Sequence, residues 1–208
     1  LNPSSAASDV YKRQDGNFYQ GKGVYSLPHP VQPKMPIINA AGSEEGRVFA
    51  MRNADFLFTP VFDFDQAKAT AADITERAAS VGRKVDVLTL CTVVCRPTQQ
   101  EAEDYLNWYA EEQADWEAVD NLMTLQGMHA QSFTPEALAL YRDRMAAGHG
   151  GFPLVGTPDT IADLLEKLSV AGIAGTTLAF VDYAKEFPYF RQEVLPRLEA
   201  KGLRQPVN

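Results

Sequence analysis

The amino-acid sequence predicts an α/β fold, namely the C-terminal half of a TIM (β/α)8 barrel. From residue 36 onward, short β-rich runs alternate with helical stretches, as in a parallel sheet joined by right-handed crossovers. The alternation gives about four strand–helix units, whereas a closed barrel takes eight strands and roughly 250 residues. The chain of 208 residues is long enough for one domain with a substantial core. A small open α/β sheet is the alternative.

The residues before the first unit predict a surface excursion. Residues 17–25 place aromatic side chains around a glycine turn, which favours a hairpin, and residues 27–36 hold four prolines, which favour an extended linker. Residues 1–14 begin with Leu, are rich in Ser and Ala, lack the apolar core of a signal peptide, and resemble translated sequencing-adapter sequence. We therefore expect a disordered, non-native leader at 1–14, a missing natural start, and a partial barrel domain at 15–208.

Four strand–helix units follow. The predicted strands are 37–39, 54–59, 85–95 and 176–181. The helices that follow them are predicted at about 44–52, 65–81, 98–115 and 185–201. Thr98 with Glu101 three residues later forms a capping box, which marks the start of the third helix.

An insertion at about 117–151 separates the third unit from the last. It is helical but irregular, and it is longer than a normal connection between elements. Thr134 and Pro135 begin one clear helix within it. Beyond it, a helix at 158–171 has apolar residues at a period of 3.6. We expect the insertion to shape the mouth of a pocket.

Composition and charge exclude several classes of function. The net charge of −8, with no basic stripe, argues against nucleic acid, and no apolar run approaches the roughly 20 residues that cross a bilayer. Three dispersed histidines give no metal-ligand spacing. Cys91 and Cys95 lie four residues apart on one predicted strand, about 13 Å, which is too far for a disulfide. We expect reduced thiols, a cytoplasmic protein, no metal and no membrane.

The segment from Pro36 to Ala50 predicts an anion-binding turn. It contains a short buried strand, a turn of small residues from Ala40 to Ser43, and then a helix. The N–H groups at a helix start lack intrahelical partners and carry the positive end of the helix dipole, so they favour phosphate. Ser43 could equally be a plain N-cap, and Gly42 a plain turn glycine.

Three further side chains are candidates for lining a substrate pocket. His149 lies in a glycine-rich run within the insertion, where it could also be an ordinary loop histidine. Asp182 and Tyr183 follow the last predicted strand, and the carboxyl ends of barrel strands face the active site. The alternative is that Asp182 caps the final helix. The catalytic residues themselves are unknown from the sequence.

Two segments resemble the bacterial luciferase-like monooxygenases, which are flavin-dependent TIM-barrel enzymes. Residues 36–55 are similar to the family's fifth strand, its glycine–serine turn and the entry to the sixth strand. Residues 150–162, with the turn at 171–175, are similar to the segments around the eighth strand. The resemblance covers about residues 15–204. It is strongest to the branch of alkanesulfonate, dimethyl sulfone and pyrimidine monooxygenases.

The resemblance implies a cofactor, partners and a substrate class. Such enzymes use reduced FMN from a separate flavin reductase, together with O2, to oxidise a small sulfonate, sulfone or heterocycle, and they form homo-oligomers. Gly42, Ser43 and the backbone N–H groups of Glu44 and Glu45 would bind the FMN phosphate. Their carboxylates would stand close to an anion. The family's first four units have no counterpart here, so the chain alone is expected to be inactive.

Two alternatives stay open. One is a deazaflavin-dependent oxidoreductase of the same superfamily, which transfers hydride. The other is a non-catalytic half-barrel that acts as a binding or assembly module through exposed edge strands.

Overall fold

The computed structural model describes residues 14–22, 28, 31–32, 34–40, 42–128 and 134–206. The chain divides after Ile38 into two compact units. In the first unit, β1 (Gln14–Asp15) and β2 (Gln20–Gly21) pair antiparallel across a turn in which the Gly16 N–H donates to the Tyr19 carbonyl. The predicted hairpin therefore exists but begins earlier than expected, because Asp15-Gly16-Asn17 supplies the turn. Apart from Gln14, the predicted leader lies outside the described residues.

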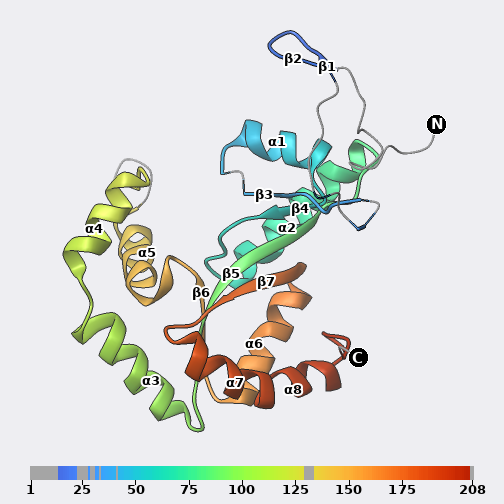
Figure 1. The fold of residues 1–208 in the computed structure, drawn as a ribbon. Helices are drawn as coiled ribbons and strands as arrows, with labels where there is room; N and C mark the ends of the chain where they lie inside the picture. Colours follow the sequence, from blue (N-terminus) through green and yellow to red (C-terminus); the bar gives the residue numbers. More distant parts are fainter. Residues whose placement is uncertain are drawn as a thin grey trace. The chain divides into compact units, whose positions relative to one another are not determined.

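A sheet of five strands forms the centre of the structure from residue 38 onward (Figure 1). Its order is β3 (Ile38–Asn39), β4 (Phe56–Phe58), β5 (Asp86–Cys95) and β6 (Phe152–Gly156), and β7 (Ile173–Ala179) also pairs with β5. The strands β4, β6 and β7 all run parallel to β5. Val87 pairs with both Leu57 and Ile173, so β4 and β7 lie on opposite edges of β5. The predicted parallel α/β arrangement is confirmed.

The strand β6 is a correction to the four predicted strands. Its five residues alternate between buried and half-buried, but they include Pro153, which weakens a strand signal. They form a strand because β5 is long enough to pair with β7 through Thr92 and with β6 from Cys91 to Cys95. A partner some 60 residues away in the sequence is not visible to a local pattern.

The helices follow the predicted order with two differences. Their bounds are α1 (Glu44–Asn53), α2 (Phe64–Ser80), α3 (Gln99–Asn107), the π-helix η1 (Trp108–Glu112), α4 (Trp116–Leu125), α5 (Pro135–Gly148), α6 (Pro158–Val170), α7 (Tyr183–Glu193) and α8 (Leu195–Ala200). The predicted helix at 98–115 thus ends in a π-helical turn. The predicted final helix divides at Val194, because Pro196 has no N–H to continue the hydrogen-bond ladder.

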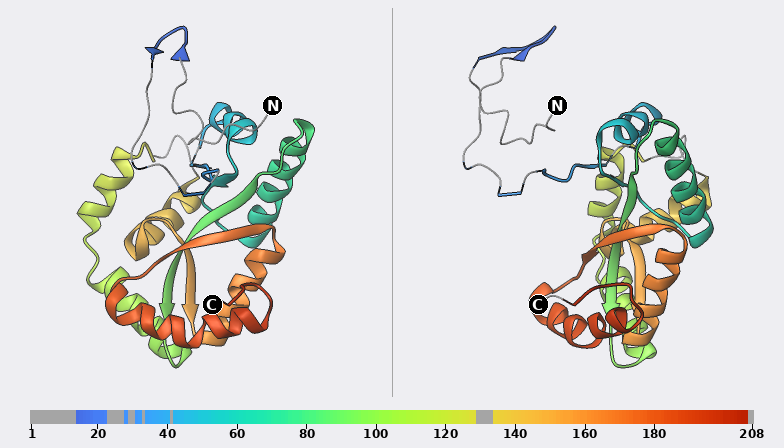
Figure 2. Two further views of the ribbon diagram at one scale, coloured as in Figure 1. Left: turned by 45° about the vertical axis from the view of Figure 1, so that its right-hand side comes forward. Right: turned by 90° about the vertical axis from the view of Figure 1, so that its right-hand side faces the viewer.

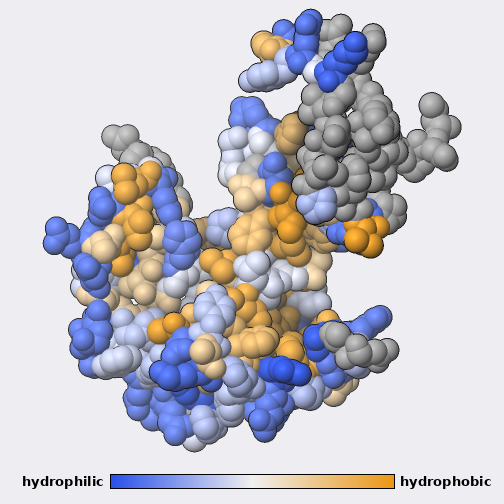
Figure 3. All heavy atoms as spheres, viewed as in Figure 1, coloured by the Kyte–Doolittle hydropathy of each residue, from blue (hydrophilic) through white to orange (hydrophobic). Residues whose placement is uncertain are grey.

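The main core lies between the sheet and the helices on one of its faces. Figure 2 shows α2 and α6 covering that face. Their side chains, including Ile74 and Ile161, pack with Leu57 and Leu154 of the sheet, and all four are fully buried. In the described part of the chain, no helix crosses the middle of the other face (Figure 2). Figure 3 shows apolar residues gathered there and polar residues over α3, α7 and α8. Half of a barrel has these two different faces.

Within the described part of the chain, no helix combines the length and the apolar character that a membrane span requires.

Candidate functional site

The helix α1 begins at Ser43, as the sequence predicts. Ser43 has extended backbone angles, and its Oγ accepts a hydrogen bond of 3.1 Å from the Gly46 N–H. Its carbonyl accepts the first helical bond, from the Arg47 N–H at 2.9 Å. The side chain is therefore an N-cap. Because Oγ uses a lone pair for the cap, its own hydrogen stays available to an acceptor outside the helix.

The start of α1 is open to a ligand. Gly42, Ser43, Glu44 and Glu45 are all exposed. A Cβ built on Gly42 would meet nothing within 4 Å, and its φ is not positive, so neither packing nor backbone conformation requires glycine there. By helix geometry the N–H groups of Glu44 and Glu45 have no partner within α1. These groups fit a phosphate: N–H donors, a hydroxyl and unobstructed space lie together.

Arg77 reduces the repulsion that Glu44 would exert on an anion. The Glu44 carboxylate forms an ion pair with Arg77 of α2, and Arg77 also bonds the Asp73 carboxylate at 3.2 Å. The hydrogen bond from Arg77 lowers the pKa of Glu44, so this carboxylate stays ionised and paired. The Glu44 carboxylate is thus engaged by Arg77, and the part that its backbone N–H would play toward an anion stays a prediction.

Two polar atoms near this turn are buried without a hydrogen-bond partner in the described structure. They are Oδ1 of Asn39, at the end of β3, and Nε of Arg47, in the first turns of α1. The sequence analysis missed Arg47. Its position four residues after Ser43 places both residues on one helix face, which is a usable signal for a cation near a bound anion.

His149 is held in an unusual conformation at the end of α5. It is the one residue other than glycine with a positive φ in the described parts of the chain (φ 55°, ψ 34°), and its side chain is exposed. Gly148 packs so closely on Thr92 of β5 that an added Cβ would lie 2.5 Å from the Thr92 Oγ1. Thr92 also donates to the Gly148 carbonyl at 3.1 Å. His149 is therefore the C-cap of α5, and the glycine before it is held against β5.

Asp182 begins α7 and lines a cleft, whereas Tyr183 turns back to the sheet. The Asp182 Oδ1 accepts from the Lys185 N–H at 3.2 Å, and its Oδ2 lies 2.8 Å from the Lys185 Nζ. Both contacts lower the pKa of Asp182, with the side-chain bond the larger cause. The Tyr183 hydroxyl donates to the Leu178 carbonyl at 3.2 Å. The alternative role of Asp182, capping the final helix, is thus confirmed.

The cleft beside Asp182 has a volume of about 500 Å³ and lies between α3 and α7, next to the carboxyl end of β5. We name it the α3–α7 cleft. Charged and aromatic side chains in its lining include Arg96, Tyr105, Trp108, Asp182, Lys185 and Glu186. Neither His149 nor Tyr183 lines it. The three pocket candidates therefore do not share this cleft.

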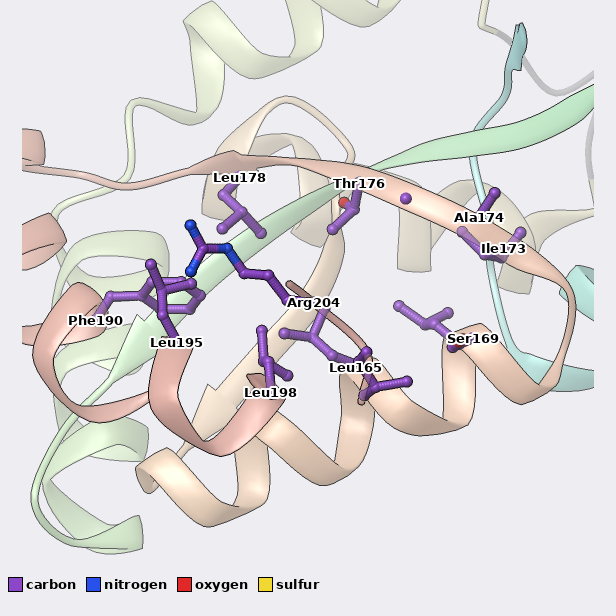
Figure 4. A pocket seen from close by; sticks show the side chains of 13 residues that line it. Leu165, Ser169, Ile173, Ala174, Thr176, Leu178, Phe190, Leu195, Leu198 and Arg204 are labelled. Atoms are coloured by element: carbon purple, nitrogen blue, oxygen red, sulfur yellow. The ribbon is translucent and has the colours of Figure 1, made fainter. Parts of the chain in front are cut away.

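A second cavity, of about 240 Å³, lies between α6, α8 and β7 (Figure 4). Six of its 13 lining residues are leucines, and Figure 4 shows the Arg204 guanidinium beside Leu178 and Leu195. Arg204 itself bonds Glu199 at 2.5 Å. Its lining consists mainly of apolar side chains of α6, α8 and β7. We therefore interpret this cavity as a loosely packed part of the core.

The two cysteines are buried and free, as predicted. Burial raises the pKa of Cys91 and of Cys95 to about 11, so both are neutral thiols at physiological pH. Among the described residues, no three His, Cys, Asp or Glu side chains are grouped as metal ligands.

Comparison with known families decides the kind of protein. The family model of luciferase-like monooxygenases matches residues 9–175. The chain belongs to this family. The luciferase-like chain is 31% identical over 197 residues to an FMNH2-dependent dimethylsulfone monooxygenase of Pseudomonas fluorescens, with 90% of this chain and 53% of that protein covered. It is 28% identical to the pyrimidine monooxygenase RutA of Rhizobium rhizogenes, covering 92% of this chain and 54% of that protein.

Solved structures confirm the fold. The crystal structure of DmoA from Hyphomicrobium sulfonivorans superposes with a TM-score of 0.77 at 22% identity, over 93% of this luciferase-like chain and 47% of DmoA. The long-chain alkane monooxygenase LadA gives a TM-score of 0.73 at 25% identity. The chain spans about half the length of the curated relatives it matches. The prediction of half a barrel agrees with this coverage.

Proposed function

We propose that this chain supplies the phosphate-binding part of an FMN-dependent monooxygenase, which uses reduced flavin and O2 to oxidise a small organic substrate. The observation that carries the proposal is the exposed start of α1, capped by Ser43 directly after β3. Family membership and relatives named as FMNH2-dependent support the choice of flavin. Reduced flavin, when bound, supplies the electrons that activate oxygen.

The proposed work of these residues is binding and orientation. The N–H groups of Glu44 and Glu45 and the Ser43 hydroxyl would donate hydrogen bonds to the phosphate oxygens. The absence of a side chain at Gly42 lets the phosphate approach the backbone. Arg47, whose Nε is buried and unpaired, would add positive charge on the same face of α1. Arg77 would keep Glu44 paired and away from the anion.

The partners and substrate follow from the relatives and are proposals in the same sense. A separate reductase would supply the reduced FMN, and the full-length enzyme would be a homo-oligomer. The names of the relatives favour a small sulfur compound or a heterocycle as substrate. His149, Asp182 and Tyr183 are proposed to lie near the substrate. Two free, buried thiols are compatible with the cytoplasm, which is the proposed location.

A deazaflavin enzyme is the second candidate. An F420-dependent secondary alcohol dehydrogenase superposes on 95% of this chain, but with a TM-score of 0.57 against 0.77 for DmoA. The assembly-module alternative rests on β7, which pairs with β5 and with no other strand of the described sheet. Its second edge could accept another strand.

Binding of FMN against riboflavin tests the proposal, because the two molecules differ only in the phosphate. Flavin fluorescence would be titrated with the wild-type chain and with Ser43→Ala and Ser43→Thr. We expect FMN to bind at least about tenfold more tightly than riboflavin, since charge-assisted bonds are the strong ones. Ser43→Ala should reduce that preference about threefold to tenfold, and Ser43→Thr, which keeps the hydroxyl, should retain it.

Equal binding of FMN and riboflavin would contradict the phosphate site. An unchanged preference in Ser43→Ala would remove Ser43 from it. Tight binding of F420 without a preference for FMN would favour the deazaflavin enzyme instead.

A further inference from the structure

The central sheet has one face that helices cover and one face that they do not. Val87 and Cys91 of β5 pack into the main core, which lies against α2 and α6. Because successive side chains of a strand point to opposite faces, Leu88 and Leu90 belong to the other face. Both leucines are half-buried. In the described structure no helix crosses the middle of that face (Figure 2).

The neighbouring strands add large apolar side chains to this uncovered face. Phe58 of β4 is paired with Leu88, and Thr177 of β7 is paired with Leu90. Paired residues share a face, and Phe56 lies two residues before Phe58, so both rings belong to it. We name the five residues Phe56, Phe58, Leu88, Leu90 and Thr177 the inner face. Contiguous apolar surface that stays in contact with water marks a site of protein association.

The charge of the inner face is compatible with a second copy of the same face. A two-fold axis brings identical surfaces together, so a charged surface would meet its own charge. The five residues of the inner face are uncharged. The carboxylate of Asp86, which is paired with Phe56, lies 3.1 Å from the Lys84 Nζ and is compensated within the chain. Two inner faces can therefore meet without repulsion between like charges.

The sheet also has two outer strands that a second copy could pair. The order β3, β4, β5 and β7 places β3 at one edge, and β7 at the other edge pairs with β5 and with no further strand of the described sheet (Figure 1). A two-fold axis parallel to the strands would place β7 of each copy beside β3 of its partner. These four strands from each copy make eight, the number that closes a parallel barrel. Closure leaves no unpaired edge.

The accessible surface of the chain is large enough for such an interface. It amounts to 13451 Å², whereas a compact monomer of 22.9 kDa exposes about 9,600 Å². The difference is about 3,900 Å², and a stable dimer needs about 800 Å² from each partner. Even if the first unit, which ends at Ile38, supplied half of this difference, the remainder would exceed that need.

We propose that this chain forms a homodimer in which the inner faces of two copies meet and β7 of each copy pairs with β3 of its partner. The dimer is a closed barrel with eight strands, four from each copy. The inner face supplies most of the stability, because β3 has two residues and offers a short edge. This inference concerns assembly alone and does not rest on flavin binding.

The mass of the flavin-free chain tests the proposal, measured by light scattering after size exclusion. At about 10 µM we expect twice 22.9 kDa. Thr177→Lys changes a residue that is exposed in the single chain, so folding should be unaffected. In the dimer the added charge would be buried without a partner, so dimerisation should weaken at least about a hundredfold.

The matched control is Val170→Lys, which adds the same charge to α6 at a residue that is 81% exposed and lies outside the inner face. It should leave the dimer unchanged. Circular dichroism confirms that both variants are folded. Hydrogen exchange tests the edge pairing: the β7 amides that do not bond β5 should exchange at least about tenfold more slowly in the wild type than in Thr177→Lys.

Five results would each overturn the proposal. They are a monomer at concentrations up to about 100 µM, an assembly larger than a dimer, an unchanged dimer in folded Thr177→Lys, equal weakening by Val170→Lys, and β7 amides that exchange equally fast in both forms. Because no flavin is present, none of these results bears on the FMN proposal. That proposal fails only through the FMN and riboflavin titration.

Discussion

Removing the Glu186 carboxylate should destabilise the protein more than any exposed charge substitution. Glu186 joins α7 to the end of β5 through Arg96, and it also accepts two backbone N–H groups at the start of α7. Glu186→Ala therefore leaves a guanidinium and two N–H groups without this acceptor. The Arg96 side chain is 22% exposed, so water can replace part of the loss.

The magnitude follows from these contacts. Breaking a buried ion pair by removing one partner costs about 3–5 kcal/mol, and partial exposure of Arg96 places this case at the lower end, about 3 kcal/mol. Glu186→Gln keeps one acceptor oxygen and should cost about half as much. For a chain of this size, 3 kcal/mol corresponds to a fall in Tm of about 6–12 °C.

Urea denaturation followed by circular dichroism measures this loss. The matched control is Glu76→Gln, an exposed glutamate on α2, which should change the free energy of unfolding by less than about 0.5 kcal/mol. The destabilisation by Glu186→Ala should persist in 0.5 M NaCl, because a buried pair is screened much less than an exposed one. A cost no larger than that of Glu76→Gln would refute the reasoning.

Two further predictions concern His149 and the cysteines. His149→Gly should raise the free energy of unfolding by about 0.5–1 kcal/mol, seen as a higher Tm, because glycine adopts the left-handed conformation at a helix end without strain; a lower Tm would mean that the imidazole makes stabilising contacts. Cys91 and Cys95, whose pKa burial raises from 9.0 to about 11, should resist a thiol reagent at pH 8 until urea unfolds the chain. Rapid labelling of the native chain at pH 8 would contradict this burial. The stability that the two neutral thiols contribute is fully present below about pH 9 and is lost as the pH rises toward 11, because the thiols of the unfolded chain ionise at a lower pH than those of the folded chain.

Local signals in the sequence located most helix starts correctly. Ser43, Thr98, Thr134 and Asp182 each cap a helix by accepting a hydrogen bond from the backbone N–H three positions later. Such a contact lies within one turn, so the residues themselves are enough to predict it. The proposed phosphate site at the start of α1 is predictable from the sequence for the same reason.

Contacts between distant residues could not be predicted in this way. The α3–α7 cleft depends on Arg96 meeting Glu186, which is 90 residues away, and no spacing rule relates them. The same holds for the loop that Arg144 of α5 secures, where its Nη1 and Nη2 donate to the carbonyls of Val61 and Phe62 at 3.0 and 2.7 Å. The π-helical turn at Trp108 likewise has no reliable signature in the sequence.

The sequence by itself determined the α/β order and the capped turn at Ser43, because these depend on periodicity and on neighbours a few residues apart. It also indicated the family, through the resemblance of residues 36–55 and 150–175 to luciferase-like monooxygenases. Only the tertiary structure decided that β6 joins the sheet, that Glu44 is paired by Arg77, and that Trp108, Asp182 and Lys185 line one cleft. Those features exist because packing brings together groups that are far apart along the chain. The stability of such contacts depends on how deeply their groups are buried, and a local sequence pattern does not reveal that burial.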